Sequence, residues 1–271
     1  PDMWLTTCQT NIFNYKYHTQ NSISPVNFQQ AIEKLPKNTL VIDLGATNGL
    51  LSQIKRIRTD LNLLGVSKFN IDFYNNISDK LWVKGYNTTK NNLRFNDLEL
   101  KFPVVVKKLE GSYGIGIMIA DSMLGLKTII QTLYKEEAVH QSGDDVIIQE
   151  FVEHKHDYRA HVLDGQVIAA MKRTPQEGDF RSNVSRGASV KSVDLSDIEK
   201  QHCIMAATQV NARWCAVDFI RSDKENSPII LEVNHAPHTQ GIEEAMRDNG
   251  AEVDAPLMTQ IVEHFERLAN E

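Results

Sequence analysis

Short apolar runs separated by polar or glycine-containing turns follow one another along most of the chain, and this pattern predicts strands. β-branched and aromatic residues dominate these runs, which are residues 39–44, 102–109, 117–120, 145–152, 158–163, 166–171, 214–220 and 229–234. Asp164-Gly165 separates two of the runs and is the strongest short hairpin signal in the chain. Much of the chain is therefore expected to form sheets.

Helices are predicted where apolar residues recur every three or four positions. This spacing is found in residues 50–64, 124–135 and 257–268. Ser196 and Glu199 form a capping box that opens a helix to about Val210, and Ser78 can cap a short helix that begins at Asp79. The alternation of such helices with strands predicts an α/β protein.

The chain divides into three expected segments, which are residues 1–76, 77–153 and 154–271. The first is a small β/α domain whose helical pattern ends near Gly65. Residues 1–25 are rich in Asn, Thr, Gln and Tyr and show little periodicity, so we expect irregular or edge structure there. Residues 87–96 are predicted to be a polar connector.

The run 229–234 carries polar side chains at a spacing that brings them together. Glu232 and Asn234 are two residues apart, so the pleat of a strand points both to one face, where Asp218 of the preceding strand can meet them. Two carboxylates and an amide oxygen are ligands that suit Mg²⁺. A sheet with one solvated face explains the same pattern, and these strands alone leave both interpretations open.

Two loops have residues that suit anion binding. Lys107 ends a strand and is followed by residues 110–116, which contain three glycines; glycines let backbone N–H groups approach a phosphate. This loop is neither a Walker A sequence nor GxGxxG, and a plain hairpin turn is the alternative. Residues 177–187 hold Arg181 and Arg186, whose forks suit phosphate or carboxylate, although a solvated loop also uses such residues.

Composition narrows the classes of function. The 271 residues are 41% hydrophobic and 24% charged, which is enough for a large core, and the net charge of −6 argues against a nucleic-acid partner. Three cysteines without a CxxC pair argue against a disulfide framework and a cysteine-rich zinc site, and favour a cytoplasmic location. The nine histidines show no zinc-ligand spacing. No run approaches the roughly 18 apolar residues of a membrane span, so no membrane partner is expected.

The order of these motifs resembles the ATP-grasp superfamily, and within it the RimK-like ligases that add glutamate to a protein C-terminus. The resemblance covers most of residues 78–270, and its most specific segments are Lys107–Gly116, Glu177–Gly187 and Ala216–Asn234. It implies an ATP-grasp fold, in which two α+β subdomains at residues 77–153 and 154–271 grip ATP. Residues 1–76 would be the small domain that precedes the grasp.

The resemblance also implies roles for individual residues. Residues implied to bind ATP are Lys80 and Lys107 at the phosphates, Gly111, Ser112, Tyr113, Gly114 and Gly116 in a mobile flap, Glu150, Phe151 and Val152 at the adenine, and Asp157 at the ribose. Those implied near the transferring phosphate and the substrate carboxylate are Arg159, Arg181, Ser182, Asn183 and Arg186. Two Mg²⁺ or Mn²⁺ ions would be held by Asp218, Glu232 and Asn234.

The function so implied is an ATP-dependent carboxylate–amine ligase that works through an acylphosphate. A peptide or protein C-terminus would be the acceptor, and an amino acid, with glutamate favoured, would be the donor. The chain is also a candidate homo-oligomer. A peptide cyclase, a small-molecule amino-acid ligase and a non-catalytic nucleotide-binding regulator are the alternatives. The chain departs from the family at His235–Gln240, where Ser-Pro-Gly is usual, and at Ala188, where a second glycine is usual.

Overall fold

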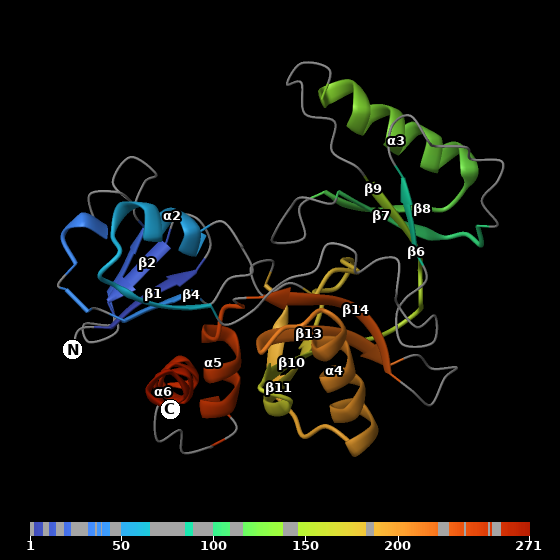
Figure 1. Cartoon of the computed structure of the whole chain (residues 1–271). Coiled ribbons are helices and arrows are strands. Elements are labelled where there is room, and N and C mark those ends of the chain that lie inside the picture. Colours follow the sequence, from blue (N-terminus) through green and yellow to red (C-terminus); the bar gives the residue numbers. More distant parts are fainter. Residues whose placement is uncertain are drawn as a thin grey trace.

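The computed structural model describes most of the chain from residue 100 onward and shorter stretches before it. The described residues are 3–7, 11–14, 19–22, 32–35, 37–38, 40–43, 50–65, 85–88, 100–108, 116–137, 146–182, 187–221, 228–235, 237–248, 250 and 256–271. They form three separate sheets of five, four and five strands. One sheet falls in each of the three segments into which we divide the chain (Figure 1), and the segment boundaries themselves stay a prediction.

The N-terminal sheet has the order β3-β2-β1-β4-β5. Its elements are β1 (Met3–Thr7), β2 (Asn11–Asn14), β3 (Thr19–Ser22), β4 (Leu40–Asp43), α2 (Leu50–Ile57) and β5 (Asn62–Gly65). Strands β1, β4 and β5 are parallel neighbours, and β2 and β3 continue the sheet in antiparallel pairs. This corrects the expectation for residues 1–25, because β1 lies inside the sheet, where backbone pairing needs no apolar alternation.

The helix predicted for residues 50–64 is also corrected, since α2 ends at Ile57. Residues 62–65 form β5 and pair with β4 from Leu40↔Asn62 to Asp43↔Gly65. A short apolar run fits helical and strand spacing equally, and the open edge of β4 supplies hydrogen-bond partners that only a strand can use.

The middle sheet has the order β6-β9-β7-β8, and all its pairs are antiparallel. Its elements are β6 (Gly85–Thr88), β7 (Val104–Lys108), β8 (Ile117–Ala120), α3 (Met123–Glu137) and β9 (Val146–Glu150). Helix α3 packs Leu126 and Ile130 against Val106 and Ile148 of the sheet. The connector predicted from residue 87 is corrected at its start, because Asn87 and Thr88 end β6 and pair with β9.

The C-terminal sheet has the order β12-β11-β10-β13-β14 and carries helices on both faces. Its strands are β10 (Asp157–Leu163), β11 (Gln166–Thr174), β12 (Ser189–Ser192), β13 (Trp214–Arg221) and β14 (Pro228–His235). Its helices are α4 (Asp197–Gln209), α5 (Gln240–Asp248) and α6 (Leu257–Asn270). Alternate residues of β10 and β13 enter two cores, one with α4 and one with α5 and α6.

Two local predictions in this part of the chain are confirmed. Asp164 and Gly165 have φ values of 44° and 76° and join β10 to β11, as the left-handed positions of a tight hairpin require. Ser196 and Glu199 form the predicted capping box: each side chain bonds the other residue's backbone N–H.

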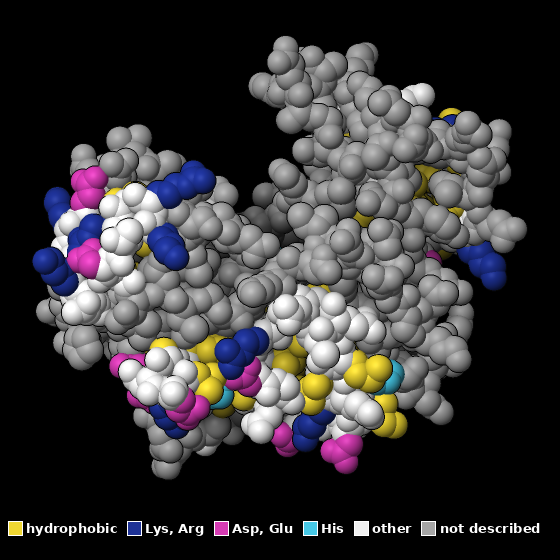
Figure 2. Space-filling model, in the orientation of Figure 1, with side chains coloured by type: hydrophobic (Ala, Val, Ile, Leu, Met, Phe, Trp, Pro, Cys, Tyr) yellow, Lys and Arg dark blue, Asp and Glu magenta, His cyan; other side chains and the backbone are white. Residues whose placement is uncertain are grey.

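None of the described helices combines the length and the apolar composition that crossing a membrane requires. On the face shown in Figure 2, described side chains of both charges are mixed with hydrophobic ones over the C-terminal part. Among the described side chains of that face, no broad patch has a single sign.

Candidate active site

A β-bulge brings two carboxylates to one face of the C-terminal sheet. Phe219 lies opposite Ile230, but the register shifts at the next residue, so Asp218 lies opposite Glu232. A regular ladder would have placed Leu231 opposite Asp218 and turned Glu232 toward the α4 core. Bulges re-aim side chains in this way, and here the shift confirms that Asp218 faces Glu232.

A second bulge selects the partner of Asp157. Strands β10 and β11 pair Val162 with Val167 but His161 with Ala169, and the shifted register sets Asp157 opposite Arg173. Continued without the shift, the hairpin would have placed Lys172 there. The two bulges thus lie on either side of β10 and β13, and both act on the face that carries Asp218.

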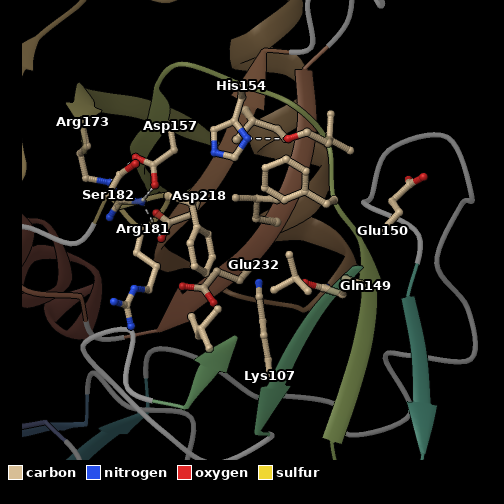
Figure 3. A pocket seen from close by; sticks show the side chains of 17 residues that line it. Lys107, Gln149, Glu150, His154, Asp157, Arg173, Arg181, Ser182, Asp218 and Glu232 are labelled. Atoms are coloured by element: carbon tan, nitrogen blue, oxygen red, sulfur yellow. Dashed lines mark hydrogen bonds and ion pairs between the residues drawn. The ribbon is translucent and has the colours of Figure 1, made fainter. Parts of the chain in front are cut away.

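Arg159, Arg173, Asp157 and Asp218 form a largely buried network on this face, and Figure 3 shows the last three of them. Arg173 donates Nε and Nη2 to the two oxygens of Asp157 at 2.5 and 2.9 Å, and its Nη2 lies 3.1 Å from Asp218 Oδ2. Arg159 donates Nε and Nη2 to Asp218 Oδ1 and Oδ2, both at 2.6 Å. Two guanidinium groups therefore share one carboxylate.

The pKa values of the two carboxyl groups move in opposite directions. Burial disfavours the charged form of Asp218, but Arg159 and Arg173 outweigh burial and hold its pKa well below the ordinary value. Burial raises the pKa of Asp157 to about 6, although Arg173 acts to lower it. Both carboxylates are therefore charged at neutral pH, and Asp157 is the one that takes up a proton in mild acid.

Asn234 completes the group expected to hold metal. Its Nδ2 donates to Glu232 Oε1 at 3.0 Å and to Asp218 Oδ2 at 3.3 Å, so all three side chains meet. No cluster of three or more His, Cys, Asp or Glu side chains in the described part of the chain could hold a metal ion. Two carboxylates with an amide oxygen still fit the hard oxygen chemistry of Mg²⁺, since the amide can turn its oxygen inward.

A pocket lies between this face and the middle sheet, and Lys107 of β7 reaches into it. Figure 3 shows its amino group pointing toward Glu232. Burial lowers the pKa of Lys107, and the carboxylates of Glu232 and Asp218 counteract that effect. The residues that line the pocket are Val105, Lys107, Ile117, Gln149, Glu150, Phe151, Val152, His154, Asp157, Arg173, Phe180, Arg181, Ser182, Asp218, Ile220, Leu231 and Glu232.

One side of the pocket is apolar and suits a flat ring. Val105 and Ile117 come from the middle sheet, Ile220 and Leu231 from the C-terminal sheet, and residues 151–152 from the segment that joins the sheets. Glu150, Phe151 and Val152, to which the resemblance assigns adenine contacts, line the pocket. The Glu150 side chain is exposed and points away from Asp218 (Figure 3), which leaves its backbone as the part that faces a ligand.

The arginine loop is held by a short-range ion pair. Arg181 donates its backbone N–H and Nε to Asp179 Oδ1, both at 2.9 Å, and Nη2 to Oδ2 at 3.0 Å. Ser182 is buried, and among the described residues its hydroxyl has no hydrogen-bond partner. A buried hydroxyl without a partner at the wall of a pocket is a group that a polar ligand can satisfy.

Several predicted site residues fall elsewhere. Those outside the described residues are Lys80, Gly111, Ser112, Tyr113, Gly114, Asn183 and Arg186. Gly116, with a φ of 79°, Arg159 and Asn234 are described but do not line the pocket, although Arg159 and Asn234 both bond Asp218 at its wall.

Sequence reasoning missed Arg173, whose side chain is only 5% exposed. Arg173 lies on β11, two strands from Asp218 on β13. The hairpin between β10 and β11 is the sequence signal from which its position could have been predicted. Counting back from Asp164-Gly165 places residue 172 or 173 opposite Asp157, depending on one bulge.

Comparisons with known proteins identify the family of the chain. The model of the RimK-like ATP-grasp domain matches residues 79–261. A probable alpha-L-glutamate ligase from Marinomonas sp. (strain MWYL1) is 37% identical over 169 residues, which are 62% of this chain and 51% of the relative. A probable alpha-L-glutamate ligase 2 from Pseudoalteromonas atlantica (strain T6c / ATCC BAA-1087) is 38% identical over 164 residues, which are 60% and 51% of the two chains. The chain thus spans about half the length of the curated relatives it matches.

Solved structures show the same fold. The D-alanine–D-alanine ligase of Bacillus anthracis complexed with ATP has a TM-score of 0.65 and 16% identity, over 95% of this chain and 89% of that one. The ATP-grasp ligase PsnB, complexed with a phosphomimetic variant of its minimal precursor, Mg and ADP, has a TM-score of 0.52 and 19% identity, over 79% and 66%. The fold is that of the ATP-grasp ligases, and with a family match over more than half of its length the chain belongs to the RimK-like ATP-grasp family.

Proposed function

We propose that this protein is an ATP-dependent carboxylate–amine ligase that joins an amino acid to the C-terminal carboxylate of a peptide or protein. The observation that carries the proposal is a pocket in which Lys107 and Arg173 lie with Asp218 and Glu232 beside an apolar slot, while Arg159 bonds Asp218 from outside the pocket lining. Phosphate chemistry concentrates oxyanions, and a site for it needs several fixed cations. The relatives named as glutamate ligases make glutamate the favoured donor.

The nucleotide would lie with its base in the apolar slot and its phosphates toward Lys107. Backbone groups of residues 150–152 would contact the adenine edge, and a lone pair of Asp157 that Arg173 leaves free would accept a ribose hydroxyl. Ser182 would donate its unpartnered hydroxyl to a phosphate oxygen. Two Mg²⁺ or Mn²⁺ ions held by Asp218, Glu232 and Asn234 would neutralise phosphate charge when bound.

The reaction would run in two displacements. An acceptor carboxylate oxygen attacks the γ-phosphorus of ATP, the bond to the bridging oxygen breaks, and an acylphosphate and ADP result. The donor amine then attacks the acyl carbon, phosphate leaves, and the nitrogen releases a proton to give the amide. The forks of Arg159 and Arg181 would hold the acceptor carboxylate in line with the phosphate, because each presents two N–H groups in a fixed plane.

The three cysteines support a reducing compartment for this enzyme. Cys203 and Cys215 are buried free thiols, and burial raises the pKa of Cys215 to about 12, so its thiol is unreactive at neutral pH. The cytoplasm is accordingly our proposal for its location.

Substrate-dependent release of ADP tests the function. The protein would be given Mg²⁺, ATP and a panel of amino acids and C-terminal peptides, with hydroxylamine added to convert an acylphosphate into a hydroxamate. We expect ADP and hydroxamate only with a matching acceptor. Cyclic products would indicate a peptide cyclase, and products that contain no peptide acceptor would indicate a small-molecule ligase. If no member of the panel gives ADP or hydroxamate, the protein is a nucleotide-binding regulator.

A pair of glutamate variants makes this assay specific to the site. Glu232→Ala should abolish turnover with the fold intact, because the Glu232 side chain is exposed and supports no core. Glu263→Ala removes a similarly exposed glutamate on α6 and should keep full turnover. Retained activity in Glu232→Ala would contradict the proposed metal ligands.

A further inference from the structure

Four N–H groups already surround the carboxylate of Asp218, and three of them lie at Oδ2. Its Oδ1 accepts Arg159 Nε at 2.6 Å, and its Oδ2 accepts Arg159 Nη2 at 2.6 Å and Asn234 Nδ2 at 3.3 Å. Arg173 Nη2 also lies near Oδ2, at 3.1 Å. A divalent cation binds carboxylate oxygens through the same lone pairs that these N–H groups use. A metal ion at Oδ2 would therefore have to displace at least one of its three donors.

The two arginines differ in how firmly they are held. The side chain of Arg173 is 5% exposed, and its second carboxylate, Asp157, anchors it through two hydrogen bonds. The side chain of Arg159 is 18% exposed, and within the described part of the chain its hydrogen bonds go to Asp218 alone. Arg159 is consequently the donor that can leave.

Charge balance points the same way. Lys107, Arg159 and Arg173 oppose Asp157, Asp218 and Glu232, so the formal charges of this group cancel. A divalent cation at Asp218 would meet the guanidinium of Arg159 at short range and repel it. The phosphates of a nucleotide would attract the released guanidinium, because a charged fork without its carboxylate needs another anion.

We propose that Arg159 holds the place of the metal on Asp218 and moves to the reacting phosphate and carboxylate when metal and nucleotide enter together. This inference rests on the proposed function and adds an order of events to it. Metal alone is opposed by Arg159, whereas metal with nucleotide gives Arg159 a new partner. Metal and nucleotide should therefore bind with positive cooperativity, and Arg159 should carry much of that coupling.

Binding of Mn²⁺ without nucleotide tests the inference. Calorimetric titration of the whole chain with Mn²⁺ should show weak binding by the wild type and roughly tenfold tighter binding by Arg159→Gln, since a competing bidentate pair is gone. Arg159→Lys keeps the charge but loses the fork, so it should also bind Mn²⁺ more tightly. Arg213→Gln breaks an equivalent bidentate pair with Asp164 outside the pocket and should match the wild type.

The outcomes separate this inference from the function beneath it. If the Arg159 variants bind Mn²⁺ no more tightly than the wild type, Arg159 does not compete with the metal and the inference is wrong. The same holds if neither the variants nor the wild type show any binding. If Arg159→Gln binds Mn²⁺ more tightly but Arg159→Lys does not, the effect comes from net charge alone. That result would also contradict the inference. Glu232→Gln reports on the metal site itself: if it binds Mn²⁺ with ADP as well as the wild type does, the proposed ligands fail whatever Arg159 does.

Discussion

Arg173 and Asp157 form a bidentate ion pair across β10 and β11, with Nε and Oδ1 at 2.5 Å and both residues buried. Breaking a buried pair by removing one partner leaves an uncompensated charge, which typically costs about 3–5 kcal/mol. Arg173 is also 3.1 Å from Asp218, so its loss exposes two carboxylates to each other. Arg173→Met should lower the free energy of unfolding by about that amount, as measured by urea denaturation.

The double variant Arg173→Met/Asp157→Asn supplies the control for this pair. It removes both charges, so it should recover part of the stability that Arg173→Met loses. A single variant within about 1 kcal/mol of the wild type, or a double variant that is no better than the single, would contradict a structural role for the pair.

Much of the architecture around this pair is readable from sequence, because the relevant signals are local. The Asp164-Gly165 turn predicts that β10 and β11 are neighbours, and the Glu232-x-Asn234 spacing predicts that two polar side chains share a face. Both predictions are confirmed. The capping box at Ser196 is confirmed for the same reason, since its two residues form a complete hydrogen-bonded motif.

The register inside the site was not readable. Each bulge inserts one residue in the outer strand, Ile168 of β11 in one pair and Leu231 of β14 in the other, and neither is a glycine that would mark the shift. A one-residue shift exchanges Lys172 for Arg173 opposite Asp157. Strands β1, β2 and β3 escaped prediction for a different reason, since backbone pairing forms them and not their own apolar pattern. Strand β2 pairs with β1 and β3, and β1 pairs with β4, which is far along the chain.

Lys107 should affect stability and ligand binding in opposite directions. Burial lowers its pKa, which means that the folded protein disfavours the charged amino group despite Glu232 and Asp218. Lys107→Met removes that cost and should raise the melting temperature of the unliganded protein. The same variant lacks the phosphate contact, so the thermal shift produced by Mg²⁺ with ATP should shrink.

Differential scanning fluorimetry with and without nucleotide measures both effects on one sample. Lys127→Met removes a lysine of α3 that does not line the pocket and serves as the control, with an unchanged ligand-induced shift. A Lys107→Met protein that keeps the full shift would place the phosphates elsewhere.

His161 should make the fold sensitive to mild acid. It is fully buried, and neither ring nitrogen has a partner among the described residues. Burial, aided by Arg159 and Arg173 and opposed by Asp218, lowers its pKa to about 3. The unfolded chain then binds a proton more readily below pH 6.5, so stability falls as the pH drops from 6.5 toward 3, by up to about 1.4 kcal/mol per pH unit.

His161→Leu replaces the ring by an apolar side chain that cannot be protonated. Between pH 7 and pH 5, the free energy of unfolding of the variant should rise relative to that of the wild type by about 2 kcal/mol, as measured by urea denaturation. His238→Gln removes an exposed histidine and should follow the wild-type pH profile. Parallel profiles for wild type and His161→Leu would show that His161 is solvated or paired in solution.

Glu199 connects helix α4 to β13 and should contribute stability with the opposite pH dependence. Its carboxylate accepts Arg221 Nε, the backbone N–H of Ser196 at 2.9 Å and the Ser196 hydroxyl at 2.8 Å. Burial alone would raise the pKa of Glu199, but these hydrogen bonds outweigh it and lower the pKa. The folded state thus favours the charged form, and its contribution is complete above the ordinary value of 4.5 and is lost as the pH falls through the lowered pKa.

Glu199→Gln should cost about 1–2 kcal/mol at pH 7, since one capping contact and one charged hydrogen bond weaken in a partly solvated setting. Below pH 4.5 the wild type loses the same charge, so the difference between the two proteins should narrow in urea denaturation at pH 3.5. Asp197→Asn removes an exposed carboxylate from the same first turn and should cost no more than a few tenths of a kcal/mol at pH 7. A Glu199→Gln deficit that stayed constant from pH 7 to pH 3.5 would mean that the shape of the side chain, and not its charge, stabilises the start of α4.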